Sequence, residues 1–145
     1  MEKEAKLVII GAGIVGASAA YHLTKLGWKD IVVVDKGPLF HTGGSTSHAP
    51  GLVFQTNGSR TMSKFAQYTV QLLNDLHTED HPTFYPVGGV EVAHTPERWQ
   101  DLHRRHGWAQ AYGMESSLLT PEAVTEHIPF LNPEVIHGGL YLPSD

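Results

Sequence analysis

The sequence contains no cysteine, which excludes disulfide bonds, thiolate metal sites and a cysteine nucleophile. It has no long uninterrupted apolar run, so we expect no membrane-spanning segment and no membrane partner. Its basic residues are scattered and its formal net charge is −5, which gives no sign of nucleic-acid binding. The first five residues lead directly into an apolar run, so we expect no targeting peptide and a cytoplasmic location.

The N-terminal 35 residues carry the pattern that organises the chain. An apolar run at 7–10 leads into Gly11-Ala12-Gly13-Ile14-Val15-Gly16, and apolar residues then recur at helical spacing over 15–26. A second apolar run follows at 31–34 and ends on Asp35. The pattern predicts a strand, a glycine turn, a crossover helix and a parallel second strand, with both strands buried on two faces.

Each residue of this motif has a physical role in binding a dinucleotide. Gly11 permits the tight exit from the strand, Gly13 lets the backbone approach a pyrophosphate, and Gly16 lets the helix lie close to the sheet. The helix N-terminus offers free N–H groups to the phosphates. Asp35 follows Gly16 by 19 residues and can accept hydrogen bonds from ribose hydroxyls. Its charge would repel a 2′-phosphate, which argues against NADP.

A loop rich in glycine and hydroxyl groups follows at 42–51 and includes Ser45, Thr46, Ser47 and His48. Small residues and hydroxyls allow a backbone to run close to a ligand and to donate hydrogen bonds to it. The predicted nucleotide-binding unit ends at Asp35, eight residues before Gly43. We therefore expect the loop to pass beside the same ligand.

The glycine motif, Asp35 and above all the segment GSTSHAPGLVFQTN at 44–57 resemble the dimethylglycine and sarcosine dehydrogenase family of D-amino-acid-oxidase-like flavoproteins. The similarity continues through 65–66, 87–93 and 138–140, so it covers essentially the whole chain. The dehydrogenases are expected to carry an aromatic residue where this chain has Ser47, and the serine favours the oxidase branch of the family.

The resemblance implies FAD as the cofactor, tethered through its 8α-methyl carbon to the imidazole of His48. It also implies that the other cofactor-binding residues divide among three parts of FAD. Ile14 and Val15, with Gly11, Gly13 and Gly16, would contact the diphosphate; Asp35 and Lys36 would contact the adenosine end; Ser45, Thr46, Ser47 and Leu52 would lie near the flavin.

The implied reaction is oxidation of an N-methyl amine such as dimethylglycine, with hydride transfer from the N-methyl carbon to flavin N5. Oxygen or an electron-transfer partner would then reoxidise the flavin. The family's catalytic base lies beyond residue 145, so we assign no catalytic residue in this chain. Folate would enter only through a C-terminal region that this chain lacks.

The rest of the chain predicts helices and strands of a second region. We expect a helix from Ser59 to about residue 76, helices at 96–107 and after Thr120, and strands at 85–93 and 135–142. The strands would begin an antiparallel sheet with Glu91 on its exposed face. Two histidine pairs, His77 with His81 and His103 with His106, are poor metal sites, so we expect no metal.

The fold class is therefore α/β. A Rossmann-type FAD-binding βαβ unit with its flavin loop at 1–58 precedes the start of an α+β substrate-side domain at 59–145. Such a fold is incomplete, because a lone βαβ unit leaves apolar faces uncovered, and we expect the isolated chain to be poorly stable. Two alternatives remain open: a fragment of an NAD-dependent dehydrogenase, and a nucleotide-binding chain without turnover.

Overall fold

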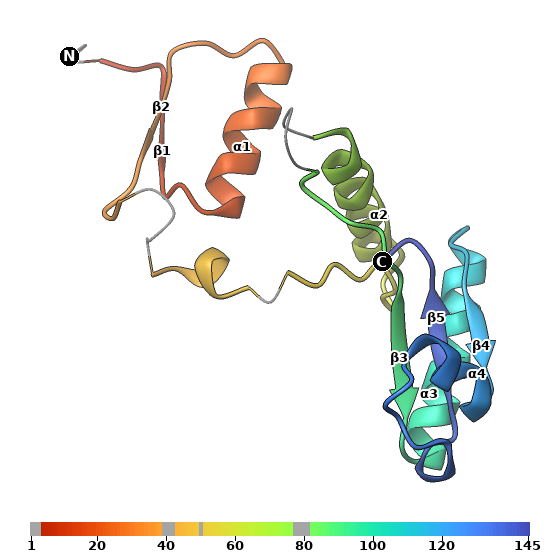
Figure 1. The fold of residues 1–145 in the computed structure, drawn as a ribbon. Helices are drawn as coiled ribbons and strands as arrows, with labels where there is room; N and C mark the ends of the chain where they lie inside the picture. Colours follow the sequence, from red (N-terminus) through yellow and green to blue (C-terminus); the bar gives the residue numbers. More distant parts are fainter. Residues whose placement is uncertain (1–3, 39–42, 50, 77–81) are drawn as a thin grey trace. The chain divides into compact units, whose positions relative to one another are not determined.

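The computed structural model describes residues 4–38, 43–49, 51–76 and 82–145. Its contacts divide the chain into two compact units, Met1–Gly51 and Leu52–Asp145, whose elements are shown in Figure 1. The predicted boundary at residue 58 separated a cofactor-binding part from a substrate-side part, and this functional division stays a prediction. Residues 52–58 belong by their contacts to the second unit.

The first unit contains the predicted strand, turn, helix and strand. Strand β1 (Leu7–Ile10) and strand β2 (Ile31–Val34) pair in parallel, in register from Leu7 opposite Ile31 to Ile10 opposite Val34. Helix α1 (Ile14–Lys25) connects them. The α/β fold and its parallel strand pair are confirmed. The sequence forms this unit because apolar runs of four residues suit short buried strands and the glycines permit the turn between strand and helix.

The strands of the first unit are more exposed than the sequence predicted. Val8 is 52% exposed and Ile10 is 88% exposed, and no residue of α1 is buried. A parallel sheet is stable when helices cover both of its faces, and the described part of this unit supplies only α1. This exposure fits the predicted incomplete fold and a chain that is a piece of a larger protein.

The second unit is built on a three-stranded antiparallel sheet with the order β3-β5-β4. Its strands are β3 (Gly89–Ala93), β4 (Ser117–Leu119) and β5 (Gly138–Leu142). Its helices are α2 (Arg60–Asp75), α3 (Pro96–Ala111) and α4 (Pro121–His127), with a short 3₁₀ helix at Pro133–Val135. The predicted antiparallel sheet is therefore present. The sequence did not reveal β4, because three residues carry too little pattern.

The core of the second unit lies between α3 and the sheet. Ala93, Leu102, Leu140 and Leu142 are buried there, and Trp99 with Leu118 packs against them. Burial of each leucine side chain contributes roughly 1.5–3 kcal/mol. This core is the stable centre of the second unit, whereas none of the described residues of the first unit is buried.

Side-chain caps begin the three helices at the positions that the sequence suggested. The hydroxyls of Ser59, Thr95 and Thr120 accept backbone N–H groups of the first turns of α2, α3 and α4. Helix α3 continues past its predicted end at Gly107 to Ala111. A glycine within a helix costs only about 1 kcal/mol, which the packing of α3 outweighs.

Glu91 was expected on an exposed face, and this expectation is wrong. Its side chain is only 29% exposed and forms ion pairs with Arg98 and Arg105 of α3. Burial alone would raise the pKa of Asp101, the second acid of this cluster. The positive charges of Arg105 and its neighbouring arginines outweigh burial and leave that pKa below its usual value. The sheet face that carries Glu91 is thus covered by a helix whose arginines neutralise it.

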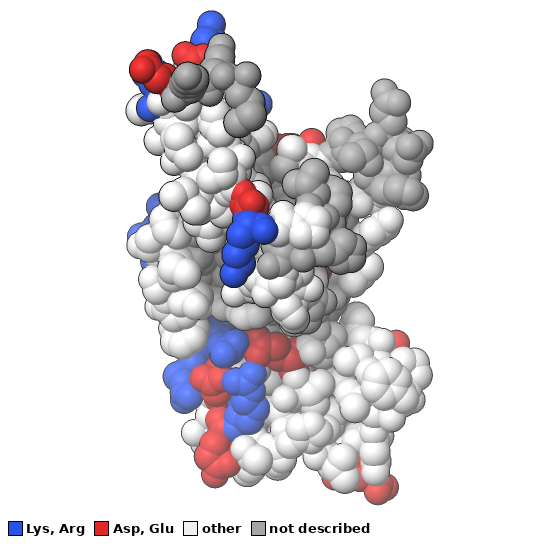
Figure 2. All heavy atoms as spheres, turned by 90° about the vertical axis from the view of Figure 1, so that its left-hand side faces the viewer, with Lys and Arg blue, Asp and Glu red and all other residues white. Residues whose placement is uncertain are grey.

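Figure 2 shows Lys and Arg side chains mixed with Asp and Glu side chains in one cluster, low in the view. Within the described residues, no helix is long and apolar enough to cross a membrane.

His77 and His81 lie outside the described residues. His103 packs edge-on against Trp99, with ring centroids 4.6 Å apart, and Nδ1 of His106 lies 2.8 Å from the Ser116 hydroxyl.

Candidate nucleotide-binding site

The first unit contains a pocket of about 540 Å³ where the two strands end beside the glycine turn. Its walls come from the ends of β1 and β2, from the turn and from the loop that follows the second strand. Ligand pockets commonly have volumes of roughly 300–1,000 Å³. The lining residues are Ile10, Gly11, Gly13, Val34, Asp35, Lys36, Gly44, Ser45 and Thr46.

The turn has its shape because glycines occupy it. Gly11 has φ +107°, a conformation that side chains disfavour. A Cβ atom on Gly16 would lie 1.9 Å from the carbonyl oxygen of Gly11, so only glycine lets α1 begin this close to β1. A Cβ atom on Gly13 would lie 3.0 Å from Oγ1 of Thr46. Glycine at this position keeps space between the turn and the loop.

Asp35 joins the end of β2 to the glycine turn. Its Oδ2 accepts the backbone N–H of Ala12 at 2.7 Å, and its Oδ1 accepts that of Gly37 at 3.1 Å. The hydrogen bond from Ala12, followed by that from Gly37, lowers the pKa of Asp35 below its ordinary value. Asp35 is therefore ionised at neutral pH, and each carboxylate oxygen retains a lone pair that can accept a ribose hydroxyl.

The N-terminus of α1 faces this region with backbone donors. The N–H of Ile14 donates to Oγ1 of Thr46 at 3.0 Å. The first helical hydrogen bond runs from Ala17 to the carbonyl of Gly13. The N–H groups of Val15 and Gly16 precede it and have no helical acceptor, so they can donate to an anionic ligand.

His48 ends the 3₁₀ helix Ser45–His48, which also carries two of the pocket residues. Its Nδ1 lies 2.9 Å from the carbonyl oxygen of Gly44 and 3.3 Å from the hydroxyl of Ser47. A carbonyl oxygen only accepts hydrogen bonds, so Nδ1 carries the hydrogen in this arrangement. The lone pair of the neutral ring is then on Nε2. The side chain is exposed and does not line the pocket.

The structure brings half of the predicted site residues together in one pocket. Those that line it are Gly11, Gly13, Asp35, Lys36, Ser45 and Thr46. The first turn of α1, which follows the glycine turn, contains Ile14, Val15 and Gly16. The 3₁₀ helix continues past the lining residues to Ser47 and His48. Leu52 belongs to the second unit. The sequence missed Ile10, Val34 and Gly44, although each is adjacent to a predicted residue.

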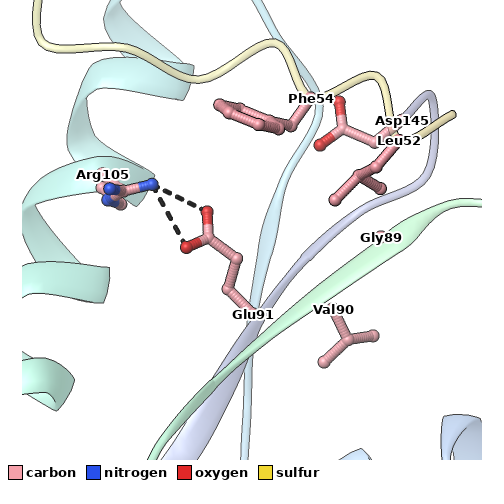
Figure 3. A pocket seen from close by; sticks show the side chains of 7 residues that line it. All are labelled: Leu52, Phe54, Gly89, Val90, Glu91, Arg105 and Asp145. Carbon is pink, nitrogen blue, oxygen red and sulfur yellow. Dashed lines mark hydrogen bonds and ion pairs between the residues drawn. The ribbon is translucent and has the colours of Figure 1, made fainter. Parts of the chain in front are cut away.

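The second unit contains a separate pocket of about 300 Å³, shown in Figure 3. Phe54, Leu52 and Val90 give it apolar walls, and the ion pair between Glu91 and Arg105 lies at one side. Gly89 and Asp145 complete the lining. Of the residues predicted to bind the cofactor, Leu52 alone lines this pocket. The sequence did not indicate the others, because they come from segments that are far apart in the chain.

Asp145 is buried beside this second pocket and is 7% exposed. Its Oδ1 accepts the backbone N–H of Gln55 at 3.1 Å and the side-chain amide of Gln55 at 3.0 Å. Burial raises the pKa of Asp145, the hydrogen bonds from Gln55 oppose that rise, and the nearby charge of Glu91 adds to it. Two segments 90 residues apart are joined at this carboxylate.

The parallel βαβ arrangement, the glycine turn and an acidic side chain at the end of the second strand define a nucleotide-binding unit of the Rossmann type. The chain belongs to the DAO family of FAD dependent oxidoreductases, whose pattern it matches over residues 6–145.

Three individual proteins illustrate this relationship. Human mitochondrial dimethylglycine dehydrogenase is 37% identical over 146 residues, covering 97% of this chain and 16% of the relative. The mouse mitochondrial pyruvate dehydrogenase phosphatase regulatory subunit is 34% identical, covering 98% of this chain and 16% of the relative. The crystal structure of L-proline dehydrogenase from P. horikoshii matches with a TM-score of 0.87 at 24% identity, covering 100% of this chain and 38% of that one.

The chain thus spans about 16% of the length of these curated relatives. The expected cytoplasmic location is wrong, because both relatives are named as mitochondrial proteins. The expectation relied on the absence of a targeting peptide before the first strand.

Proposed function

We propose that this chain is the N-terminal FAD-binding portion of an oxidoreductase that oxidises N-methyl amines such as dimethylglycine. The observation that carries the proposal is the convergence of the glycine turn, Asp35 and the Ser45–Thr46 segment on one pocket. These residues fit a cofactor with a ribose, a diphosphate and a ring. A side chain at position 13 would fill the space between turn and loop that such a cofactor needs.

Each part of the pocket has a distinct task in this proposal. The carboxylate of Asp35 accepts the adenosine ribose hydroxyls, and Lys36 lies beside that end. The N–H groups of Val15 and Gly16, together with the positive end of α1, bind the diphosphate. Ser45, Thr46 and Ser47 lie toward the flavin, and the flavin contact of Leu52 stays a prediction, since Leu52 belongs to the second unit.

When bound, FAD would supply a two-electron acceptor for the hydride on the carbon next to the amine nitrogen. The residues of this chain would bind and orient it, and the proposal assigns none of them to holding the amine or moving its proton. The dimethylglycine dehydrogenase relative supports an N-methyl amine as the substrate. Oxygen or an electron-transfer partner would be the final electron acceptor in this proposal.

His48 is proposed as the point of covalent attachment. A bond between an imidazole nitrogen and the 8α-methyl carbon replaces one C–H of the methyl group and the N–H of the ring. Molecular oxygen takes both hydrogens and leaves as hydrogen peroxide. Nε2 carries the ring lone pair as His48 stands. Attachment through either nitrogen removes the ring hydrogen, so the hydrogen bond from Nδ1 to the carbonyl of Gly44 is lost in the neutral product.

Intact mass tests the cofactor and the linkage together, and it is measured on the full-length protein that contains this chain. We expect a mass gain of one FAD less two hydrogens that survives acid precipitation and disappears in His48→Ala. His22→Ala is the matched control, because His22 is also in the first unit and its Nδ1 lies 2.7 Å from the carbonyl of Ser18. Covalent flavin that persists in His48→Ala contradicts the assignment.

Turnover is tested separately. We expect anaerobic bleaching of the flavin spectrum on addition of dimethylglycine or sarcosine, and reoxidation by air or by an artificial electron acceptor. One relative is named as a regulatory subunit, which favours a second candidate, a nucleotide-binding chain without turnover. Protein that binds FAD but is not bleached by any N-methyl amine supports this second candidate. An NAD-dependent dehydrogenase would instead bind NAD and lack flavin absorbance.

A further inference from the structure

Thr46 connects two segments that are far apart in the sequence. Its Oγ1 accepts the backbone N–H of Ile14 at 3.0 Å, across 32 residues of chain. Ile14 is the first residue of α1, and the cap residue Gly13 has no side chain with which to accept this donor itself. A residue of the loop therefore performs the capping role that a local serine or aspartate has in other helices.

Hydrogen bonds within the loop connect Thr46 to His48, so the hydrogen bond between Thr46 and Ile14 also restrains His48. The backbone N–H of Ala49 donates to the carbonyl of Thr46 at 3.3 Å. The hydroxyl of Ser47 donates to the carbonyl of Gly44 at 2.8 Å, and Nδ1 of His48 donates to the same oxygen at 2.9 Å. These bonds close a single 3₁₀ turn in which His48 is two residues from Thr46.

The chemistry of a hydroxyl allows Thr46 to contact the helix and a ligand together. A hydroxyl has one hydrogen and two lone pairs. Since one lone pair accepts from Ile14, the hydrogen remains available for an oxygen of a ligand in the pocket that Thr46 lines. An anionic ligand at the glycine turn thus strengthens the link between α1 and the loop that carries His48.

We propose that Thr46 is a positioning residue that couples occupancy of the diphosphate turn to covalent attachment at His48. The inference rests on the proposed function. The hydrogen bond between Thr46 and Ile14 holds the turn at 45–48 against α1. The imidazole of His48 then stays within reach of the flavin 8α-methyl carbon long enough to react. Fixing two reacting groups relative to one another accelerates their reaction without changing their chemistry.

The test compares Thr46→Val with Thr46→Ser in the full-length apoprotein. Valine matches threonine in shape but has no hydroxyl, whereas serine keeps it. FAD is added at saturating concentration, so that a change in affinity does not enter the rate, and covalent flavin is followed by acid precipitation and intact mass. Loss of one hydrogen bond predicts attachment about three- to tenfold slower in Thr46→Val. Thr46→Ser should attach within about twofold of wild type, because the bond is retained.

A second measurement does not depend on flavin chemistry. Amide hydrogen exchange of the apoprotein should be faster at Ile14 and across 43–49 in Thr46→Val than in Thr46→Ser. Attachment at the wild-type rate in Thr46→Val, or equal slowing in both variants, overturns the coupling. A Thr46→Val protein that binds no FAD also overturns it, since Thr46 would then be required for binding itself and not for positioning His48. Wild type that binds FAD without ever attaching it contradicts the role of His48 itself, which is a different result.

Discussion

Asp35 accepts the backbone N–H of Ala12 at 2.7 Å and thereby links the end of β2 to the middle of the glycine turn. We expect Asp35→Asn to weaken FAD binding about tenfold, because hydrogen bonds to a charged acceptor are roughly twice as strong as those to a neutral one. Fluorescence titration of the apoprotein with FAD measures this. Asp30→Asn is the matched control, since asparagine tolerates the φ of 58° at this position. Equal affinities for both variants would exclude the proposed ribose contact.

Gly16→Ala should abolish FAD binding, because its new Cβ would lie 1.9 Å from the carbonyl oxygen of Gly11 and force α1 away from β1. Such overpacking typically costs roughly 1–3 kcal/mol and here distorts the phosphate-binding turn itself. Gly107→Ala in α3 is the control: no atom lies within 4 Å of its new Cβ. That substitution should stabilise the protein by up to about 1 kcal/mol. FAD binding that survives Gly16→Ala would show that the turn can relax.

Asp145 provides a prediction about pH. Burial raises its pKa, so the folded state holds its proton more tightly than the unfolded state does. Above the raised pKa the charged carboxylate of Asp145 lowers the free energy of unfolding. This destabilisation disappears as the pH falls through the raised pKa and the carboxylate takes up a proton. Asp145→Asn should raise the urea midpoint at pH 7, and its advantage over wild type should shrink toward pH 4. An advantage that grows on acidification would reverse the assigned sign.

Thr95→Ala should lower the free energy of unfolding of the second unit by about 1 kcal/mol, as expected for loss of a helix cap. The hydroxyl of Thr95 accepts the N–H of Arg98 at 3.2 Å. Thr125→Ala serves as the control, because the hydroxyl of Thr125 donates only to the carbonyl of Glu122 within α4. Alanine is also the better helix former there. Urea denaturation followed by tryptophan fluorescence distinguishes the two, and equal midpoints would exclude a capping contribution.

The nucleotide-binding unit was readable from the sequence because local rules determine it. The spacing of Gly11, Gly13 and Gly16 fixes the turn, the apolar runs fix the strands, and Asp35 lies where the second strand must end. The helix caps at Ser59, Thr95 and Thr120 are equally local, since each hydroxyl bonds a backbone N–H of its own helix.

What the sequence did not reveal depends on contacts between distant segments. The alternation around Glu91 indicated an exposed face, but the arginines of α3 that cover this face lie in another element. The bonds between Gln55 and Asp145 span 90 residues and have no signature in either segment. The bond from Ile14 to Thr46 likewise joins a helix start to a loop that the sequence could place only as neighbouring.

The parallel strands β1 and β2 form a sheet of two, so each has one backbone edge that no other strand within the described residues pairs with. Open edges that carry apolar side chains are templates for strand addition by another chain. A recombinant product that stops at residue 145 should therefore oligomerise through these edges, with concentration-dependent turbidity. Joining it to the remaining length of the protein should suppress that growth.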